Sequence, residues 1–104
     1  PWPKVGWLEQ ALGRLLGRTK DGAAAEPDRE ELFALLNRRM PVAEPAEDSI
    51  LARARVTPFV SGPDYGTRAS TLILADQHGG WQCIERRFGP AGMPAGETQV
   101  RHTP

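Results

Sequence analysis

The segment 70–75 constrains the fold most, because it predicts a strand that is apolar on both of its faces. Its sequence, Ser-Thr-Leu-Ile-Leu-Ala, is aliphatic and partly β-branched, which is typical of strands. Side chains alternate along a strand, so Leu72 and Leu74 share one face while Thr71 and Ile73 share the other. A strand that is apolar on both faces is usually buried between two layers. The fold must therefore supply cover on both sides of this segment.

A β-hairpin is predicted around this strand. Residues 76–80, Asp-Gln-His-Gly-Gly, have the composition of a tight turn, and residues 81–87 return as the partner strand. A hairpin alone is marginal in water, so the 70–75/81–87 pair needs further layers or strands. The residues after Phe88 are rich in glycine, proline and polar side chains, and we expect them to be irregular.

Two amphipathic helices precede the hairpin. Pro3 fits the first turn of the first helix, where a missing N–H costs nothing. The second helix is predicted to begin after Asp28, a natural N-cap, and to end at Pro41. Arg38 and Arg39 are expected in its last turn, where cations oppose the helix dipole. The apolar stripe of the first helix consists of Val5, Leu8, Leu12, Leu15 and Leu16.

The connection between the helices and the hairpin is harder to assign. Residues 49–55 are compatible with either a short helical turn or the lead into a strand. Residues 56–60 predict a short strand, in which Pro58 indicates an edge or irregular position. The chain is thus predicted to be α+β, with two helices packed on an antiparallel sheet. The helices can cover one face of the sheet, and we expect a missing segment to cover the other.

Length and charge narrow the class of protein. The chain has 104 residues, enough for one small domain, and its 13 basic and 13 acidic residues leave no net charge to attract nucleic acid. Its apolar runs fall short of the ~20 residues that span a bilayer, and no signal-peptide pattern is visible. The single cysteine, Cys83, fits a reducing compartment such as the cytoplasm. The first residue is Pro1 rather than methionine, so we expect a fragment or a processed chain.

Motifs for metal, phosphate or cofactor binding are absent from the sequence. Cys83 lies in the middle of a predicted strand, which favours a small buried hydrophobe over a nucleophile. His78 is expected to be a solvated turn residue, and His102 a residue of a mobile tail. Neither a catalytic residue nor a metal ligand is assigned.

Residues 65–71, Tyr-Gly-Thr-Arg-Ala-Ser-Thr, are the most informative polar stretch, because they lead directly into the buried strand. A rigid strand can hold such groups at the mouth of a cleft, where Arg68 would clamp a carboxylate with two hydrogen bonds. The alternative is structural: Gly66 provides a turn and Arg68 pairs with an acidic neighbour such as Glu85. The residues alone favour the structural alternative.

The stretch 65–74, the 76–80 turn and Glu85-Arg86 after it resemble the carboxy-terminal signature of the NRDE family, the transport and Golgi organisation protein 2-like proteins. The start of the chain, Pro-Trp-Pro-Lys-Val, is also similar to this family. The resemblance implies an N-terminal-nucleophile-hydrolase-like four-layer αββα fold. Residues 1–104 would be the carboxy-terminal portion of one such domain, with the amino-terminal half missing. The implied ligand-binding residues are Tyr65, Gly66, Thr67, Arg68, Ser70 and Thr71, followed by Glu85 and Arg86.

The sequence also departs from the family. The Asn-Arg-Asp-Glu motif belongs to the missing half, and residues 37–40 (Asn-Arg-Arg-Met) are a helix end rather than that motif. The family's near-terminal cysteine is absent too, and Cys83 does not take its role.

Three functions remain open. The resemblance implies binding or trafficking of haem, or of another hydrophobic metabolite, by the complete protein; haem would be a transported ligand rather than a resident cofactor. The second is an amide hydrolase whose terminal cysteine lies in the missing half. The third is that residues 65–71 only build the start of a strand, because fold does not imply function. Expected partners are an amphipathic ligand and the missing half.

Overall fold

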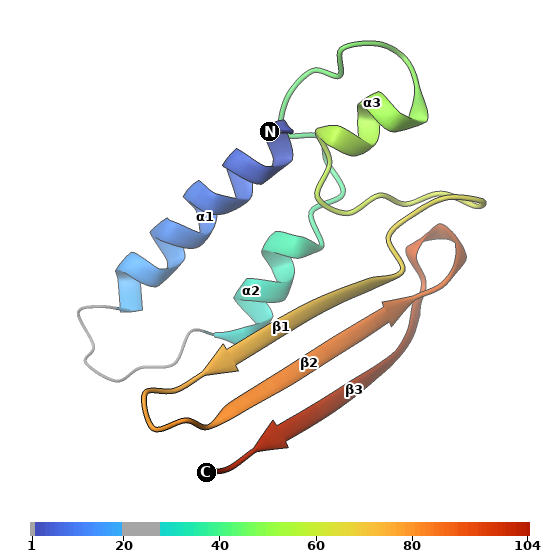
Figure 1. The fold of residues 1–104 in the computed structure, drawn as a ribbon. Coiled ribbons are helices and arrows are strands. Elements are labelled where there is room, and N and C mark those ends of the chain that lie inside the picture. Colours follow the sequence, from blue (N-terminus) through green and yellow to red (C-terminus); the bar gives the residue numbers. More distant parts are fainter. Residues whose placement is uncertain (1, 20–27) are drawn as a thin grey trace. The chain divides into compact units, whose positions relative to one another are not determined.

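The computed structural model describes residues 2–19 and 28–104, which form two compact units (Figure 1). The first unit, Pro1–Val60, contains helices α1 (Pro3–Thr19), α2 (Arg29–Leu36) and α3 (Ile50–Arg55). The second, Ser61–Pro104, contains β1 (Ala69–Ala75), β2 (Trp81–Phe88) and β3 (Pro94–His102) in one antiparallel sheet of order β1-β2-β3. The predicted α+β class is confirmed. The packing of the helices on the sheet stays a prediction.

Helices α1 and α2 contact each other through part of the predicted apolar stripe. Ala11 and Leu15 of α1 are buried, with 6% and 5% of their surface exposed. Val5, Leu12 and Leu16 remain 38–40% exposed, because the stripe covers a wider arc of α1 than one neighbouring helix can bury. Within the described ranges, each helix is too short or too polar to cross a bilayer.

Helices α2 and α3 both begin at a side-chain cap. The Asp28 Oδ1 atom accepts a hydrogen bond from the Glu30 N–H at 2.9 Å, as expected for an N-cap. The Ser49 Oγ atom accepts one from the Ala52 N–H at 3.1 Å. This cap resolves the open assignment of residues 49–55 in favour of a helix.

Helix α2 ends earlier than predicted. The Asn37 N–H donates to the Phe33 carbonyl at 2.8 Å and closes the last turn, so the prediction that the helix extends to Pro41 is wrong. Arg38 and Arg39 lie beyond that turn and stack their guanidinium groups on aromatic rings instead of opposing the dipole. Their partners are the rings of Trp7, at 4.9 Å, and Phe59, at 4.6 Å.

Residues 56–60 do not form the predicted strand. Val56 is the C-cap of α3, and its carbonyl accepts a hydrogen bond from the Val42 N–H at 2.8 Å. The Phe59 N–H donates to the Arg38 carbonyl at 2.9 Å. These separate bonds hold the segment against the connection after α2, while Val56 and Phe59 are only 3% and 1% exposed. The apolar side chains of this segment are instead buried in the core of the first unit.

The predicted hairpin is confirmed. Strands β1 and β2 pair in antiparallel register, with Ile73 opposite Cys83. The turn is closed by the Asp76 Oδ1 atom, which accepts hydrogen bonds from the N–H groups of His78 at 2.7 Å and Gly80 at 3.0 Å. His78 is thus a turn residue, as predicted.

The prediction of an irregular tail is wrong, because residues 94–102 form β3. This strand pairs with β2 in antiparallel register. Its polar composition did not predict the interactions between the two strands. The Arg86 Nε atom donates to the Glu97 Oε1 atom at 2.8 Å, and the rings of Trp81 and His102 stack with centroids 5.7 Å apart. His102 is therefore a strand residue and not part of a mobile tail.

The two faces of the sheet differ in burial. The face that contains Ser70, Ile84 and Arg86, here the Ile84 face, buries Ile84 completely and leaves Ser70 only 7% exposed. The opposite face, here the Ile73 face, contains Thr71, Ile73, Cys83, Glu85 and Val100. Ile73 is 70% exposed and Val100 51% exposed. Within the described residues, the side chains of the sheet are thus more buried on the Ile84 face than on the Ile73 face.

Candidate functional site

The polar segment before β1 follows a tight turn. A Cβ atom on Gly62 would lie 2.7 Å from the Tyr65 carbonyl oxygen, so the backbone approaches too closely for a larger residue. The Gly62 carbonyl also accepts a hydrogen bond from the Ala91 N–H at 3.0 Å, which ties this turn to the connection between β2 and β3. Tyr65 follows the turn with 53% of its surface exposed.

Arg68 has a fixed backbone and an exposed side chain. Its carbonyl accepts a hydrogen bond from the Phe88 N–H at 2.8 Å, at the end of β2. Among the residues that the structure describes, no acidic group pairs with its guanidinium. The predicted pair between Arg68 and Glu85 is wrong, because the Glu85 carboxylate pairs with Arg87 at 3.3 Å.

The predicted ligand-binding residues do not converge on one face. Ser70 is buried on the Ile84 face opposite Arg86, whereas Thr71 is exposed on the Ile73 face opposite Glu85. Gly66 and Thr67 are half-buried in the segment before the strand. Tyr65 and Arg68 therefore remain as exposed groups of one segment, while Ser70 and Thr71 belong to two separate environments.

Each face carries its own polar network between strands. On the Ile84 face, Glu97 binds Arg86 and also accepts a hydrogen bond from the Gln99 side chain at 2.9 Å. On the Ile73 face, the Arg87 guanidinium donates to Glu85 at 3.3 Å and to Thr98 Oγ1 at 2.6 Å. The Arg86–Glu97 and Arg87–Thr98 contacts cross from β2 to β3 and support their register. Arg86 is thus bonded across to β3, whereas Glu85 pairs with Arg87 within β2.

Arg68 differs from the other arginines of residues 61–104, because each of the others has a side-chain partner. Arg86 and Arg87 pair with carboxylates, and Arg101 donates to the Gln82 side chain at 3.4 Å. Arg68 is the arginine of this range whose side chain has no such partner. A planar guanidinium with free donors can bind a carboxylate through two parallel hydrogen bonds.

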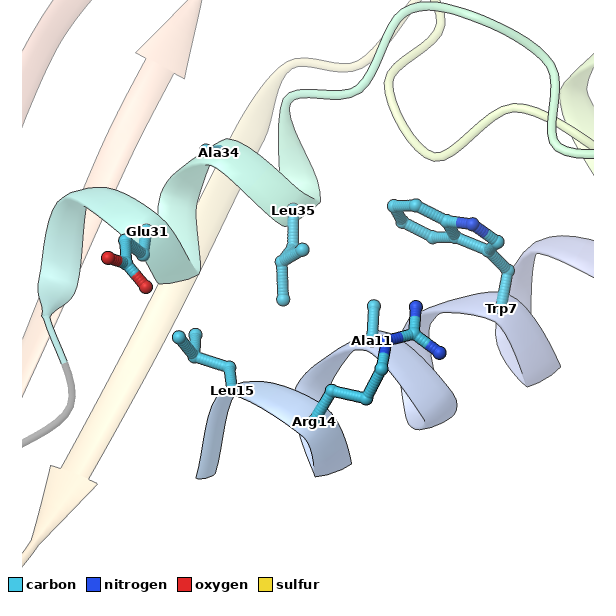
Figure 2. A pocket seen from close by; sticks show the side chains of 7 residues that line it. All are labelled: Trp7, Ala11, Arg14, Leu15, Glu31, Ala34 and Leu35. Atoms are coloured by element: carbon cyan, nitrogen blue, oxygen red, sulfur yellow. The ribbon is translucent and has the colours of Figure 1, made fainter. Parts of the chain in front are cut away.

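The structure also contains a groove that the sequence did not predict. It lies between α1 and α2 and has a volume of about 710 Å³ (Figure 2). The sequence signal for it is the pair Ala11 and Ala34, one small residue on each helix among those that line the groove. The groove is lined by Trp7, Ala11, Arg14, Leu15, Glu31, Ala34 and Leu35.

Cys83 is free and half-buried on the Ile73 face. Its cross-strand neighbours are Ile73 on β1 and Val100 on β3. This apolar setting fits the predicted role as a small hydrophobe. Within residues 2–19 and 28–104, no three or more His, Cys, Asp or Glu side chains gather as metal ligands would.

Comparison with known proteins identifies a family. The family model described as Transport and Golgi organisation 2 matches residues 1–90, which include the three α-helices, the hairpin and the 65–71 segment. No curated protein and no solved structure matches the chain. The family match spans most of the 104 residues and agrees with the resemblance seen in residues 65–87. The chain therefore belongs to the Transport and Golgi organisation 2, or NRDE, family.

Proposed function

We propose that this protein binds an amphipathic metabolite that carries a carboxylate, with haem as the foremost candidate, and that Arg68 holds the carboxylate. The observation that carries the proposal is the exposed Arg68 guanidinium, which lacks an acidic partner among the described residues. Membership of the Transport and Golgi organisation 2 family supports a metabolite-handling role. Haem would be cargo and would not be a resident cofactor.

Tyr65 would supply the apolar contact. Tyr65, three residues before Arg68, has 53% of its surface exposed, so it is available to pack against the body of a ligand. The nearest acidic group on the paired strand, Glu85, is held by Arg87 and does not neutralise Arg68. The Arg68 carbonyl is bonded to the Phe88 N–H, which limits the entropy that its main chain loses when a ligand binds.

We further propose that the amino-terminal part of the family domain covers the Ile73 face. The exposed side chains of Ile73 and Val100 on this face support this proposal, because exposed apolar side chains gain free energy when a partner layer buries them. The completed domain would have the N-terminal-nucleophile-hydrolase-like αββα fold. The amide-hydrolase alternative stays a prediction, since its nucleophile would lie outside these residues. The free Cys83 supports a cytoplasmic site of action.

Absorbance titration with haem tests the binding proposal. We expect a saturable change in the haem spectrum with the native chain and a large loss of affinity in Arg68→Ala. Arg101→Ala is the matched control, because it removes the same charge from an exposed arginine of β3. Equal affinity of the two variants, or no saturable change with the native chain, would contradict the proposal.

A further inference from the structure

The groove between α1 and α2 has the dimensions and lining of a small-molecule site. Its volume of about 710 Å³ lies within the roughly 300–1,000 Å³ of typical ligand pockets. Most of its lining is apolar, with Ala11 and Leu15 from α1 and Ala34 and Leu35 from α2. Ala34 is exposed and small, so the side chain at this position leaves the groove open. The apolar lining would bury a hydrocarbon chain rather than a polar solute.

The charges of the groove are separated along its length. Figure 2 shows the Arg14 guanidinium directed toward the end where Trp7 lies, whereas the Glu31 carboxylate lies at the end near Leu15. Arg14 is exposed and has no ion pair among the described residues. This separation gives the two ends of the groove opposite charges.

A second cation strengthens the positive end. The Arg38 guanidinium stacks on the Trp7 ring at 4.9 Å. It is held there because its Nε atom donates to the Met40 carbonyl at 3.1 Å and its Nη2 atom donates to the Pro41 carbonyl at 3.4 Å. The Trp7 ring is thus fixed between a stacked cation and the groove. An anionic head group is complementary to this end, and an apolar chain is complementary to the remainder.

We propose that this groove binds a single-chain amphiphile with one carboxylate, whose head group lies beside Arg14 and whose chain lies over Ala11, Leu15 and Leu35. The proposal does not rest on the Arg68 site, because the groove belongs to the helical unit and has its own cation. Binding should strengthen about fourfold for each CH₂ group added, as long as the added group is still buried.

Tryptophan emission provides the test. The chain has three tryptophans, so Trp2→Phe combined with Trp81→Phe leaves Trp7 as the reporter. Dodecanoate is titrated below its micelle concentration, and dodecanol serves as the neutral analogue. We expect saturable binding of dodecanoate that Arg14→Gln weakens about tenfold, equivalent to about 1.4 kcal/mol. Dodecanol should bind the native and Arg14→Gln proteins equally.

Two further variants of the groove keep the test decisive. Ala34→Phe should abolish dodecanoate binding by filling the groove from an exposed position, so its fold can be checked independently by circular dichroism. Glu31→Gln is the matched control for Arg14→Gln, because it removes a charge from the opposite end and should not weaken binding.

Several outcomes would overturn the inference. One is the absence of a saturable change in Trp7 emission, and another is equal affinity of the native and Arg14→Gln proteins. Loss of binding in Arg68→Ala with no effect of Ala34→Phe would assign the amphiphile to the Arg68 site, leaving the proposed function intact. A change that depends on protein concentration alone would assign the groove to a second copy of the chain.

Discussion

The Arg68 carbonyl accepts a hydrogen bond from the Phe88 N–H at 2.8 Å, so the main chain of Arg68 is tied to the end of β2 while its side chain is exposed. The backbone bond does not depend on the identity of the side chain. A substitution at Arg68 therefore separates a structural role from a binding role, because it leaves this bond in place.

Arg68→Ala should change the free energy of unfolding by less than about 0.5 kcal/mol, as for other exposed positions without partners. Urea-induced unfolding of the native and variant chains, followed by circular dichroism, measures the difference. A loss of about 2 kcal/mol or more would instead support the interpretation that residues 65–71 only build the start of β1.

The two isoleucines of the sheet should respond very differently to truncation. Ile84→Ala should lower the free energy of unfolding by about 2–5 kcal/mol, because Ile84 has no exposed surface and its removal leaves a cavity. Ile73→Ala is the matched control and should cost less than about 1 kcal/mol in the same chain, since Ile73 is 70% exposed. Similar losses in urea unfolding would show that the Ile73 face is covered after all.

Two glycines should give opposite results when replaced by alanine. Gly13→Ala should stabilise the chain by about 0.5–1 kcal/mol, because a Cβ atom there meets nothing within 4 Å and alanine favours a helix. Gly62→Ala should destabilise it by about 1–3 kcal/mol, because the new Cβ would lie 2.7 Å from the Tyr65 carbonyl oxygen. Thermal melts of both variants measure the two changes, and an unchanged melting temperature for Gly62→Ala would contradict the close approach.

The sequence predicted correctly those elements that are determined by contacts between residues only a few positions apart. The hairpin was predictable because residues 70–75 alternate and Asp76 can close the following turn with its own side chain. Helix α2 was predictable at its start for the same reason, since Asp28 caps it locally.

The errors occurred where distant residues decide the structure. Strand β3 pairs with β2, where Glu97 contacts Arg86 and His102 contacts Trp81, and its own polar sequence does not indicate those partners. Residues 56–60 have strand-like composition, yet the Phe59 N–H bonds to the Arg38 carbonyl.

The candidate site was predicted in part. Arg68 was identified from the sequence, but the sequence did not show that Glu85 pairs with Arg87 on its own strand and leaves Arg68 without an acidic partner among the described residues. The groove between α1 and α2 was missed, because Arg14 and Glu31 come to opposite ends of one groove only when the helices pack.

The central claim is that Arg68 binds the carboxylate of an amphipathic ligand, and a comparison of haem with its dimethyl ester tests it most directly. The ester removes the carboxylate charges and keeps the apolar body. We predict that the native chain binds haem at least about tenfold more tightly than the ester, equivalent to about 1.4 kcal/mol, and that Arg68→Ala binds both equally. If the same preference for haem over the ester persisted in Arg68→Ala, the claim would be contradicted.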